Sequence, residues 1–483
     1  MTSHNLTQYG FSQPMLQALI GLGYDDLTEV QKMVIPAALA GRDVIVSSQT
    51  GSGKTAAFAI PVCEQIVLNQ RPPQVLVLTP TRELAVQVKQ TITQIGRFKQ
   101  IRCAAIFGKQ SMQSQCNELR QRVHVIVGTP GRTFDHIEIG NLNLTEIAWF
   151  IIDEADKMLD LGFIDQVEAI INQLPFNRVT MVFSATLPQP VQTLCEQYMK
   201  TPLRIDVAEA SPLHDKIKQC FCAVPENEKT GLALNFLYAM RPERCILFCN
   251  TRERVDTLAE EFKRTDWRWT SLHGGMEQRE RLQTMRDFKQ GRFQVLIATD
   301  VAARGIHVDD VSLVINVDMP FDNESYIHRI GRTGRQENSG FAISFVTPAE
   351  HGYLAGLEAY LQYKLRRQEP PSAQAVEQGK RLVTKKSRPP LPTGSADEQL
   401  TRDISRIRIN AGRKEKMRPG DILGAVTAIP GITANDIGII DIQATCSYVE
   451  IFNNKGDEVL DALIMAKIKG KNRTVRSVGF RDS

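Results

Sequence analysis

The chain has 483 residues, more than one hydrophobic core usually supports, so two or three domains are expected. Its 42% hydrophobic and 23% charged residues are typical of a globular protein, no apolar run could span a bilayer, and the N-terminal MTSHNLTQYG lacks the features of a secretion signal. The formal net charge is +4, but residues 1–363 carry −4, whereas residues 364–401 and 402–483 carry +4 each. The basic tail could bind a polyanion such as RNA, or it could be a solvated surface without a partner.

Short apolar runs alternate with amphipathic stretches in two series. The first series comprises Asp43–Ser48, Val75–Pro80, Val123–Val127, Phe150–Asp153 and Val179–Ser184. The second comprises Cys245–Asn250, Val295–Thr299, Leu313–Val317 and Ala342–Val346. Such Val- and Ile-rich runs predict buried parallel strands joined by helices. The polar stretch around Asp206–Lys218 separates the series, so two α/β domains are predicted, residues 1–208 and 209–365.

The remaining residues predict a linker and a small third domain. Residues 366–401 are rich in Pro, Gln, Lys and Ser, as expected for a flexible basic linker. Residues 402–483 predict an α+β domain whose elements follow the order strand, helix, strand, strand, helix, strand. Those elements are Ile404–Asn410, Pro419–Ala428, Gly438–Gln443, Ser447–Asn453, Asp457–Ala466 and Thr474–Gly479.

A glycine-rich loop follows the first predicted strand and opens a helix. It consists of Ser48, Gln49, Thr50, Gly51, Ser52, Gly53, Lys54 and Thr55. In a phosphate-binding loop, backbone N–H groups and the helix N-terminus surround the phosphates, the lysine pairs with the β- and γ-phosphates, and the hydroxyl binds Mg²⁺. Lys54 and Thr55 are therefore predicted to bind ATP and magnesium.

The second half of such a site is an acidic strand end. The run Phe150–Asp153 delivers Asp153 to the carboxyl edge of the sheet, where it is predicted to bind Mg²⁺. Glu154 is placed to orient or deprotonate the attacking water. Asp156 lies too far along the turn for the same ion, so a structural ion pair is expected there.

Together these blocks resemble the DEAD-box family of RNA helicases, named for Asp153-Glu154-Ala155-Asp156. The further family blocks appear in order as Pro80–Ala85, Thr129–Arg132, Ser184–Thr186, Leu247–Asn250, Gln278–Arg281, Thr299–Gly305 and His328–Arg335. The matches cover about residues 11–348. The resemblance implies two RecA-like parallel-sheet domains in tandem and ATP-driven local unwinding of RNA duplexes.

The resemblance also implies roles for residues of the second domain. Arg332 and Arg335 would be arginine fingers that stabilise charge on the transferred phosphoryl group. Hydrolysis would then require the two domains to close. Gly305 would contact ATP, and Ser184, Thr186, Asp300 and His328 would couple the domains, although Ser184 and Thr186 could also serve only as a helix cap.

Upstream, residues 9–37 match the family's Q motif through Phe11, Thr28 and Gln31. An amide offers one donor and one acceptor to the adenine edge, which predicts ATP over GTP. Phe11 would stack on the adenine ring, or else belong to the core.

RNA contacts in the family come from amides, hydroxyls and arginines aimed at phosphates. By resemblance, the candidates in the first domain are Thr81, Arg82, Gly108, Thr129, Gly131 and Arg132. Those in the second domain are Thr251, Gly275, Gln278, Arg281 and Thr299. Two departures from the family pattern stand out: Lys109 replaces the second glycine of a Gly-Gly pair, and His307 replaces an aspartate that often contacts the ribose, so no role is assigned to His307.

The third domain has the element order of an RNA-recognition motif with a poor aromatic signature. Arg408 takes the place of the usual first-strand aromatic, and Tyr448 alone keeps an aromatic position, which weakens base stacking. Two loops are basic, and the candidate RNA contacts of this domain are Arg408, Tyr448 and, from those loops, Lys414, Lys416, Lys469 and Lys471. Asp436–Ile440 and Ser447–Ile451, with Gly108–Gln110 and His273–Met276, resemble the DbpA subfamily. That resemblance implies 23S ribosomal RNA as substrate, pre-50S particles as the setting and large-subunit assembly as the process.

Two other interpretations compete with this one. The chain could be a general or mRNA-decay helicase with a protein-binding tail, or an ATP-gated RNA clamp that does not unwind; the intact Glu154, Arg332 and Arg335 argue against the clamp. The nine cysteines include no CxxC, so reduced thiols and a cytoplasmic protein are expected. A monomer that binds neither DNA nor membrane is expected.

Overall fold

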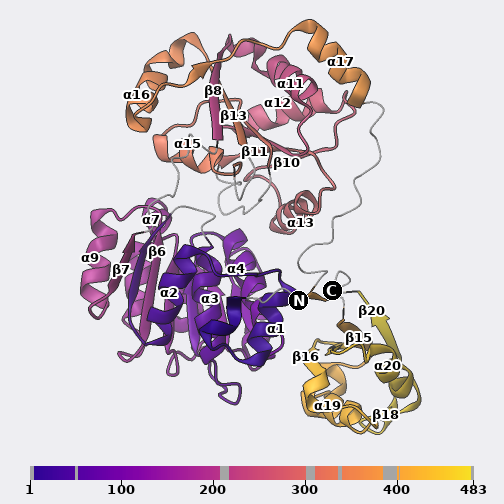
Figure 1. Cartoon of the computed structure of the whole chain (residues 1–483). Helices are drawn as coiled ribbons and strands as arrows, with labels where there is room; N and C mark the ends of the chain where they lie inside the picture. The colour runs from indigo at the N-terminus through magenta and orange to yellow at the C-terminus, as the bar shows by residue number, and fades with distance from the viewer. Residues whose placement is uncertain are drawn as a thin grey trace. The chain divides into compact units, whose positions relative to one another are not determined.

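The computed structural model describes residues 5–48, 53–206, 217–300, 311–334, 340–383, 400–401 and 403–479. Their strands form two parallel seven-stranded sheets, one antiparallel four-stranded sheet and a two-stranded hairpin (Figure 1). The predicted fold class is thereby confirmed, with two RecA-like α/β domains followed by a small α+β domain. Within these residues no helix has the length and apolarity to cross a membrane. All nine cysteines are buried free thiols, as expected.

The first sheet has the strand order β3-β4-β2-β5-β6-β1-β7, and every neighbouring pair is parallel. Its strands are β1 (Val44–Ser47), β2 (Val75–Leu78), β3 (Cys103–Ile106), β4 (Val125–Gly128), β5 (Trp149–Asp153), β6 (Val179–Ser184) and β7 (Leu203–Asp206). Five of them were predicted from their apolar runs. The sequence analysis missed β3 and β7, because Ala and Cys in β3 and the charges of β7 weaken the apolar signal.

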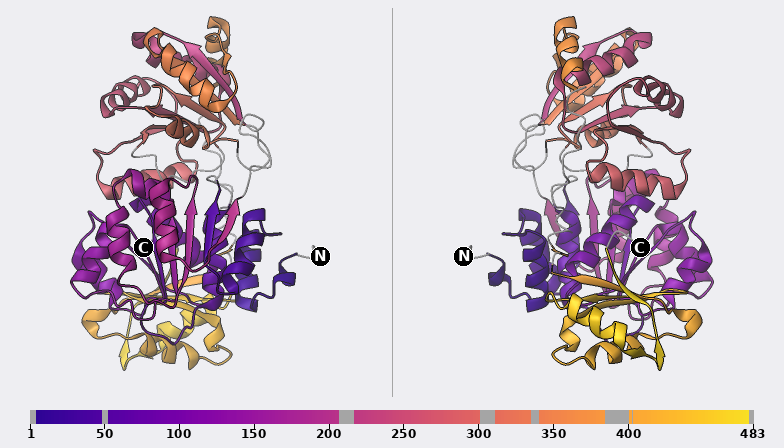
Figure 2. Two further views of the ribbon diagram at one scale, coloured as in Figure 1. Left: turned by 90° about the vertical axis from the view of Figure 1, so that its left-hand side faces the viewer. Right: turned by 90° about the vertical axis from the view of Figure 1, so that its right-hand side faces the viewer.

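Helices cover both faces of the first sheet. They are α1 (Gln13–Gly21), α2 (Glu29–Leu39), α3 (Lys54–Gln65), α4 (Arg82–Ile95), α5 (Met112–Leu119), α6 (Pro130–Glu138), α7 (Ala155–Asp160), α8 (Ile164–Ile171) and α9 (Gln189–Tyr198). Helices α1–α4 share one apolar core with alternate strand residues, and α6–α9 share the other. In Figure 2 the indigo helices near the N-terminus lie on one side of these strands and the later magenta helices on the other. Burial on both faces explains the nearly continuous apolar runs.

The second sheet repeats this plan in the order β10-β11-β9-β12-β13-β8-β14, again with parallel neighbours. Its strands are β8 (Ile217–Ala223), β9 (Cys245–Cys249), β10 (Trp269–Leu272), β11 (Val295–Thr299), β12 (Leu313–Asn316), β13 (Gly340–Val346) and β14 (Arg366–Arg367). Its helices are α11 (Lys229–Met240), α12 (Arg252–Phe262), α13 (Gln278–Lys289), α15 (Asn323–Ile330), α16 (His351–Leu361) and α17 (Ala373–Val383).

The linker prediction was wrong for residues 366–383. Strand β14 pairs with β8, and α17 follows it and packs on α11 (Figure 1). The approach of these helices needs a glycine, since a Cβ atom on Gly379 would lie 1.8 Å from the carbonyl oxygen of Tyr238. The Pro370-Pro371 pair, which suggested a linker, instead precedes the start of α17. The rest of the predicted linker, residues 384–399, lies outside the described residues.

The third domain has a four-stranded antiparallel sheet in the order β16-β17-β15-β20. Its elements are β15 (Ser405–Ile409), α19 (Pro419–Thr427), β16 (Ile437–Ile442), β17 (Ser447–Ile451), α20 (Gly456–Met465) and β20 (Val475–Val478). All six were predicted, and the two helices pack on one face of the sheet. The structure adds a short hairpin, β18 (Lys467–Ile468) with β19 (Lys471–Asn472), which two-residue strands could not signal in the sequence.

Candidate functional site

The candidate site residues of the first domain follow the order of its strands. Strands β5 and β6 end at the predicted nucleotide and coupling residues Asp153 and Ser184, and the neighbouring strand β1 precedes Lys54 in the chain. The adjacent strands β3, β4 and β2 precede the predicted RNA residues Gly108, Thr129 and Thr81. Because all these strands are parallel, both groups lie at the carboxyl edge of one sheet, where ligands bind in open α/β folds.

Lys54 is the first residue of α3, and Thr55 follows it in the same helical turn. Gly53 precedes the helix with a left-handed φ of 89°, a conformation that favours glycine. The Lys54 ammonium is buried; burial lowers its pKa, while the Asp153 and Glu154 carboxylates oppose that change. A buried cation at a helix N-terminus suits a polyphosphate. Residues 49–52 (Gln49, Thr50, Gly51 and Ser52) lie outside the described residues.

Asp153 and Glu154 are buried neighbours at the end of β5. Burial and the adjacent Glu154 carboxylate raise the pKa of Asp153 to about 7. Glu154 has a left-handed φ of 55°, and its Oε2 atom lies 3.2 Å from Nζ of Lys157. A divalent cation fits this pair, because it would hold both buried carboxylates in the ionised form.

Asp156 does not form the structural ion pair that the sequence suggested. Its Oδ2 atom accepts hydrogen bonds from the N–H groups of Ala185 and Thr186, both at 3.0 Å, and from the Thr186 hydroxyl at 3.3 Å. In return, the Ser184 hydroxyl accepts the N–H of Asp156 at 3.0 Å. The acidic strand end of β5 is thus tied directly to the end of β6.

The Q-motif residues lie beside the phosphate loop. Gln31 Oε1 accepts the N–H of Thr28 at 2.9 Å, and its Nε2 donates to the carbonyl of Gly53 at 3.3 Å. Phe11 is buried in the core and stacks on Tyr9 with ring centroids 5.8 Å apart. The structure therefore links Gln31 to the glycine loop through backbone groups and places Phe11 in the core, the alternative that its sequence position left open.

The RNA candidates of the first domain sit at helix N-termini. Thr81 caps α4, with its hydroxyl accepting the N–H of Leu84 at 3.3 Å, and Arg82 is the first residue of that helix. Thr129 precedes α6, which contains Gly131 and Arg132. A Cβ atom on Gly108 would lie 3.3 Å from Arg82 Nη2, so the glycine makes room for the guanidinium. Helix N-termini and guanidiniums are suited to phosphate oxygens.

Gln115 is a residue that the sequence analysis missed. Its side chain is fully buried, and its Oε1 atom lies 3.0 Å from both Arg132 Nη1 and His136 Nε2. Its Nε2 donates to the Phe107 carbonyl at 2.9 Å and to Gln110 Oε1 at 2.8 Å. The amide thereby fixes Arg132 against the turn at residues 108–110. A glutamine in an amphipathic helix carries no sequence signal for such a role.

The turn beside Gln115 contains one departure from the family pattern. Lys109 has a left-handed φ of 58°, the conformation that a glycine at this place would adopt freely. A lysine side chain there costs about 1 kcal/mol of backbone strain. Its ammonium is exposed next to Gly108 and adds a positive charge beside the predicted RNA contacts.

The second domain repeats this arrangement at its own sheet edge. The neighbouring strands β10, β11 and β9 lead to Gly275, Thr299 and Thr251, and the Thr251 hydroxyl caps α12 by accepting the N–H of Arg254 at 3.2 Å. Gln278 and Arg281 lie in the first turn of α13. The predicted RNA residues of each domain thus share one edge of that domain's sheet.

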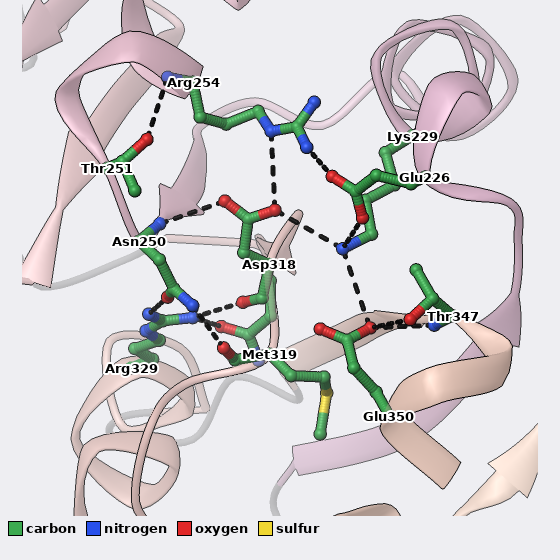
Figure 3. A network of polar contacts seen from close by, with 11 residues as sticks. Glu226, Lys229, Asn250, Thr251, Arg254, Asp318, Met319, Arg329, Thr347 and Glu350 are labelled. Atoms are coloured by element: carbon green, nitrogen blue, oxygen red, sulfur yellow. Dashed lines mark hydrogen bonds and ion pairs between the residues drawn. The ribbon is translucent and has the colours of Figure 1, made fainter.

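Arg329 is the centre of a buried polar network in the second domain (Figure 3). Its guanidinium contacts Asp300 Oδ2 at 2.5 Å, the Asp318 carbonyl at 2.6 Å and Asn250 Oδ1 at 2.7 Å, and it lies over the Phe248 ring. Asp300, predicted as a coupling residue, is therefore paired with Arg329, to which the sequence analysis gave no role of its own.

His328 lies in α15, and Arg332 lies two residues beyond the end of that helix. Arg332 is buried, and its Nε donates to the carbonyl of His328 at 3.1 Å. The Arg332 N–H donates to the carbonyl of Arg329 at 3.2 Å, so the position of Arg332 depends on that of Arg329. Gly305, His307 and Arg335 lie outside the described residues.

In the third domain the aromatic position is already occupied. Tyr448 is buried, and the Arg406 guanidinium lies 4.3 Å from its ring centroid. Arg408 is the register partner of Tyr448 on β15. This self-contact takes the stacking face that an RNA base would otherwise use.

The two basic loops of the third domain are joined to each other. Lys469, at the tip of the β18–β19 hairpin, places its Nζ on the Lys416 carbonyl and 2.9 Å from Asp421 Oδ2. Lys414, Lys416 and Lys471 are exposed around this contact. The result is one basic surface made from loops that are distant in sequence.

Comparison with known proteins agrees with this geometry. Residues 28–194 match the DEAD/DEAH box helicase model, 228–337 the helicase conserved C-terminal domain and 406–477 the DbpA RNA binding domain. The ATP-dependent RNA helicases DbpA of Bacillus subtilis and Escherichia coli are 48% and 37% identical, with 97% and 94% of this chain and 98% and 95% of theirs aligned.

Two further matches cover less of the chain. The DEAD-box ATP-dependent RNA helicase CshA of Geobacillus kaustophilus is 41% identical over 78% of this chain and 80% of its own. The structure of Saccharomyces cerevisiae Dbp5 bound to RNA and ADP BeF3 matches with a TM-score of 0.70 and 30% identity, covering 79% of this chain and 99% of that one. The chain belongs to the DEAD-box family of ATP-dependent RNA helicases. Its third domain places it in the DbpA group of that family.

Proposed function

We propose that this helicase unwinds 23S ribosomal RNA locally during assembly of the large ribosomal subunit, and that its third domain selects the site. The observation that carries the proposal is the joined basic surface around Lys414, Lys416, Lys469 and Lys471. Phosphate-binding lysines in paired loops suit a folded RNA, whereas the Arg406–Tyr448 contact leaves the sheet face poorly suited to stacking bases.

The ATP site would work through residues already described. Lys54 would neutralise the phosphates, while Thr55 and Asp153 would hold Mg²⁺, whose charge stabilises the transferred phosphoryl group. Glu154 would accept the proton of the attacking water. Arg332, together with Arg335, would stabilise charge on the γ-phosphate. Gln31 would read the adenine edge, so ATP should be preferred over GTP.

The motor's own RNA contacts would be unspecific. The candidates at the sheet edges are Thr81, Arg82, Gly108, Thr129, Gly131, Arg132, Thr251, Gly275, Gln278, Arg281 and Thr299. Helix N-termini and arginines directed at the RNA backbone carry little sequence information. Selectivity would therefore depend on the third domain of a monomeric, cytoplasmic protein that acts within pre-50S particles.

A panel of RNAs tests the proposal. ATP turnover of the full chain should be stimulated selectively by fragments of 23S rRNA, and Lys54→Ala should abolish turnover. Removal of residues 402–483 should preserve RNA-dependent turnover and eliminate the selectivity. Equal stimulation by unrelated RNAs in the full chain would favour a general helicase with a protein-binding tail. Failure to displace a duplex strand with ATP would favour a clamp.

A further inference from the structure

Lys229 is a buried cation with no role in the site described so far. It is the first residue of α11, and its side chain is 1% exposed. Its Nζ lies 2.9 Å from Glu226 Oε2, 3.4 Å from Asp318 Oδ1 and 3.6 Å from Glu350 Oε2 (Figure 3). A buried ammonium is costly unless it is paired, so this lysine is expected to fix the carboxylates around it.

Asp318 connects Lys229 to the segment that contains Thr251, a predicted RNA contact of the second domain. Its Oδ2 atom accepts the N–H of Asn250 at 3.0 Å, and its Oδ1 atom lies 3.5 Å from Arg254 Nε. Asn250 is followed by Thr251, the cap of α12 and a predicted RNA contact. Lys229 thus fixes the Asp318 carboxylate, and that carboxylate in turn fixes Asn250, directly before the predicted RNA contact Thr251.

Asp318 and Asn250 also bind Arg329. The Asp318 carbonyl and Asn250 Oδ1 both accept hydrogen bonds from the Arg329 guanidinium, at 2.6 and 2.7 Å. Asn250 Nδ2 also donates to the Met319 carbonyl at 2.7 Å, which closes the arrangement seen in Figure 3. Arg332 follows Arg329 by one helical turn and bonds to its carbonyl.

We propose that Lys229 is a positioning residue for RNA-dependent ATP hydrolysis. It holds Asp318 so that the start of α12, which contains the predicted RNA contact Thr251, and the turn after α15, which carries Arg332, keep a fixed relation. The inference rests on the proposed function, since it takes Thr251 as an RNA contact and Arg332 as an ATP contact. RNA binding at one end of this network then sets the geometry of the guanidinium at the other.

The test compares variants of the full chain by RNA-stimulated ATP turnover. Lys229→Met should raise the RNA concentration for half-maximal stimulation about tenfold and lower the maximal stimulated rate several-fold. The KM for ATP should stay within about twofold of the original value, because first-domain residues bind the nucleotide. Lys229→Arg should recover most of the loss. Lys263→Met, which makes the same substitution at an exposed lysine just after α12, is the matched control and should behave like the unmodified protein.

A second variant separates positioning from simple charge balance. Lys229→Met/Glu350→Gln removes the buried ammonium and a partly exposed carboxylate that faces it, so the second domain should regain thermal stability even if the single variant folds poorly. Its RNA response should remain weak, because Asp318 still lacks its lysine. Recovery of both stability and RNA response in this double variant would overturn the proposal, as would normal kinetics of Lys229→Met. If the unmodified protein showed no RNA stimulation, the proposed function itself would fail and the inference with it.

Discussion

The Oε1 atom of Gln115 lies 3.0 Å from Nη1 of Arg132, so a buried amide orients a guanidinium among the predicted RNA contacts of the first domain. The same oxygen accepts from His136, whose Nε2 must therefore carry the hydrogen. Burial, followed by the Arg132 charge, lowers the pKa of His136, which keeps that ring neutral. All hydrogen-bonding groups of Gln115 are thus committed to holding Arg132 against the turn at residues 108–110.

Replacing Gln115 by Met should weaken RNA binding by the motor. The apolar side chain has a similar size but supplies no hydrogen bonds, so Arg132 and Gln110 lose their shared anchor. We expect the RNA concentration for half-maximal ATPase stimulation to rise about tenfold, with KM for ATP unchanged. Gln113→Met, on the exposed face of the same helix, is the control. Equal RNA affinity in the two variants would contradict the assignment.

Lys109 has a strained backbone conformation, and its positive charge lies beside the predicted RNA contacts. Two substitutions separate the effects of the strain and the charge. Lys109→Gly should stabilise the first domain by about 1 kcal/mol, because glycine adopts the left-handed conformation without a Cβ penalty. It should also reduce the salt dependence of RNA binding by about 0.7 in the log–log slope, as expected for one lost phosphate contact to a single strand. Lys109→Ala should show the same change in slope without the gain in stability. An unchanged slope in both would exclude a phosphate contact.

His124 should make the first domain sensitive to acid. Its Nδ1 accepts the N–H of Arg102 at 3.0 Å, and burial lowers its pKa to about 4. The unfolded chain binds a proton near pH 6.5 while the folded domain does not, so the free energy of unfolding should fall by about 3 kcal/mol as pH drops from 6.5 to 4.

Urea unfolding can measure this effect on one domain. Trp149 lies in the first domain, so a Trp267→Phe/Trp269→Phe background leaves a single fluorescent reporter there. His124→Gln should flatten the acid-dependent loss of stability, whereas His351→Gln, at an exposed position of the second domain, should leave it intact. Identical pH profiles for the background and the His124→Gln variant would show that other groups cause the acid sensitivity.

The lysines of the third domain should divide into two functional types. Lys414→Ala/Lys416→Ala should lower the preference for 23S fragments about tenfold and leave the maximal rate on unspecific RNA unchanged. Lys469→Ala should cause the same loss and also destabilise the domain, because its Nζ joins two loops through Asp421 and the Lys416 carbonyl. Stability is read by thermal unfolding, and selectivity by competition between the two RNAs. If the Lys414→Ala/Lys416→Ala variant kept its preference for 23S fragments, these two lysines would not belong to the RNA-recognition surface.

Sequence patterns predicted the parts of this molecule whose signal is local. Val- and Ile-rich runs located most strands of both parallel sheets, and the loop before Lys54 and the Asp153–Glu154 pair indicated the candidate nucleotide site. The strands with weaker patterns, β3, β7, β8, β10 and β14, were missed because their residues are small, polar or mixed. Helix α17 was not predicted, because the proline pair that precedes it is typical of a linker in other contexts.

Contacts between distant positions could not be predicted in this way. Gln115 and Arg132, or Lys229 and Asp318, meet only after the sheet has formed, and neither pair follows a helical or strand spacing. The Arg406–Tyr448 contact likewise depends on the register between β15 and β17. A motif shows which groups carry the chemistry, whereas the groups that hold them in place are set by the folded chain.

The hairpin formed by β18 and β19 has a consequence for engineering. Ile468 is its one buried residue, and the sheet and helices of the third domain pack mainly through other side chains. New sequences could be grafted at the hairpin tip and at residues 413–416 while the apolar interior stays as it is. Such chimaeras would keep the two helicase domains and change only the RNA that the third domain selects. One helicase could then be directed to a series of different RNAs.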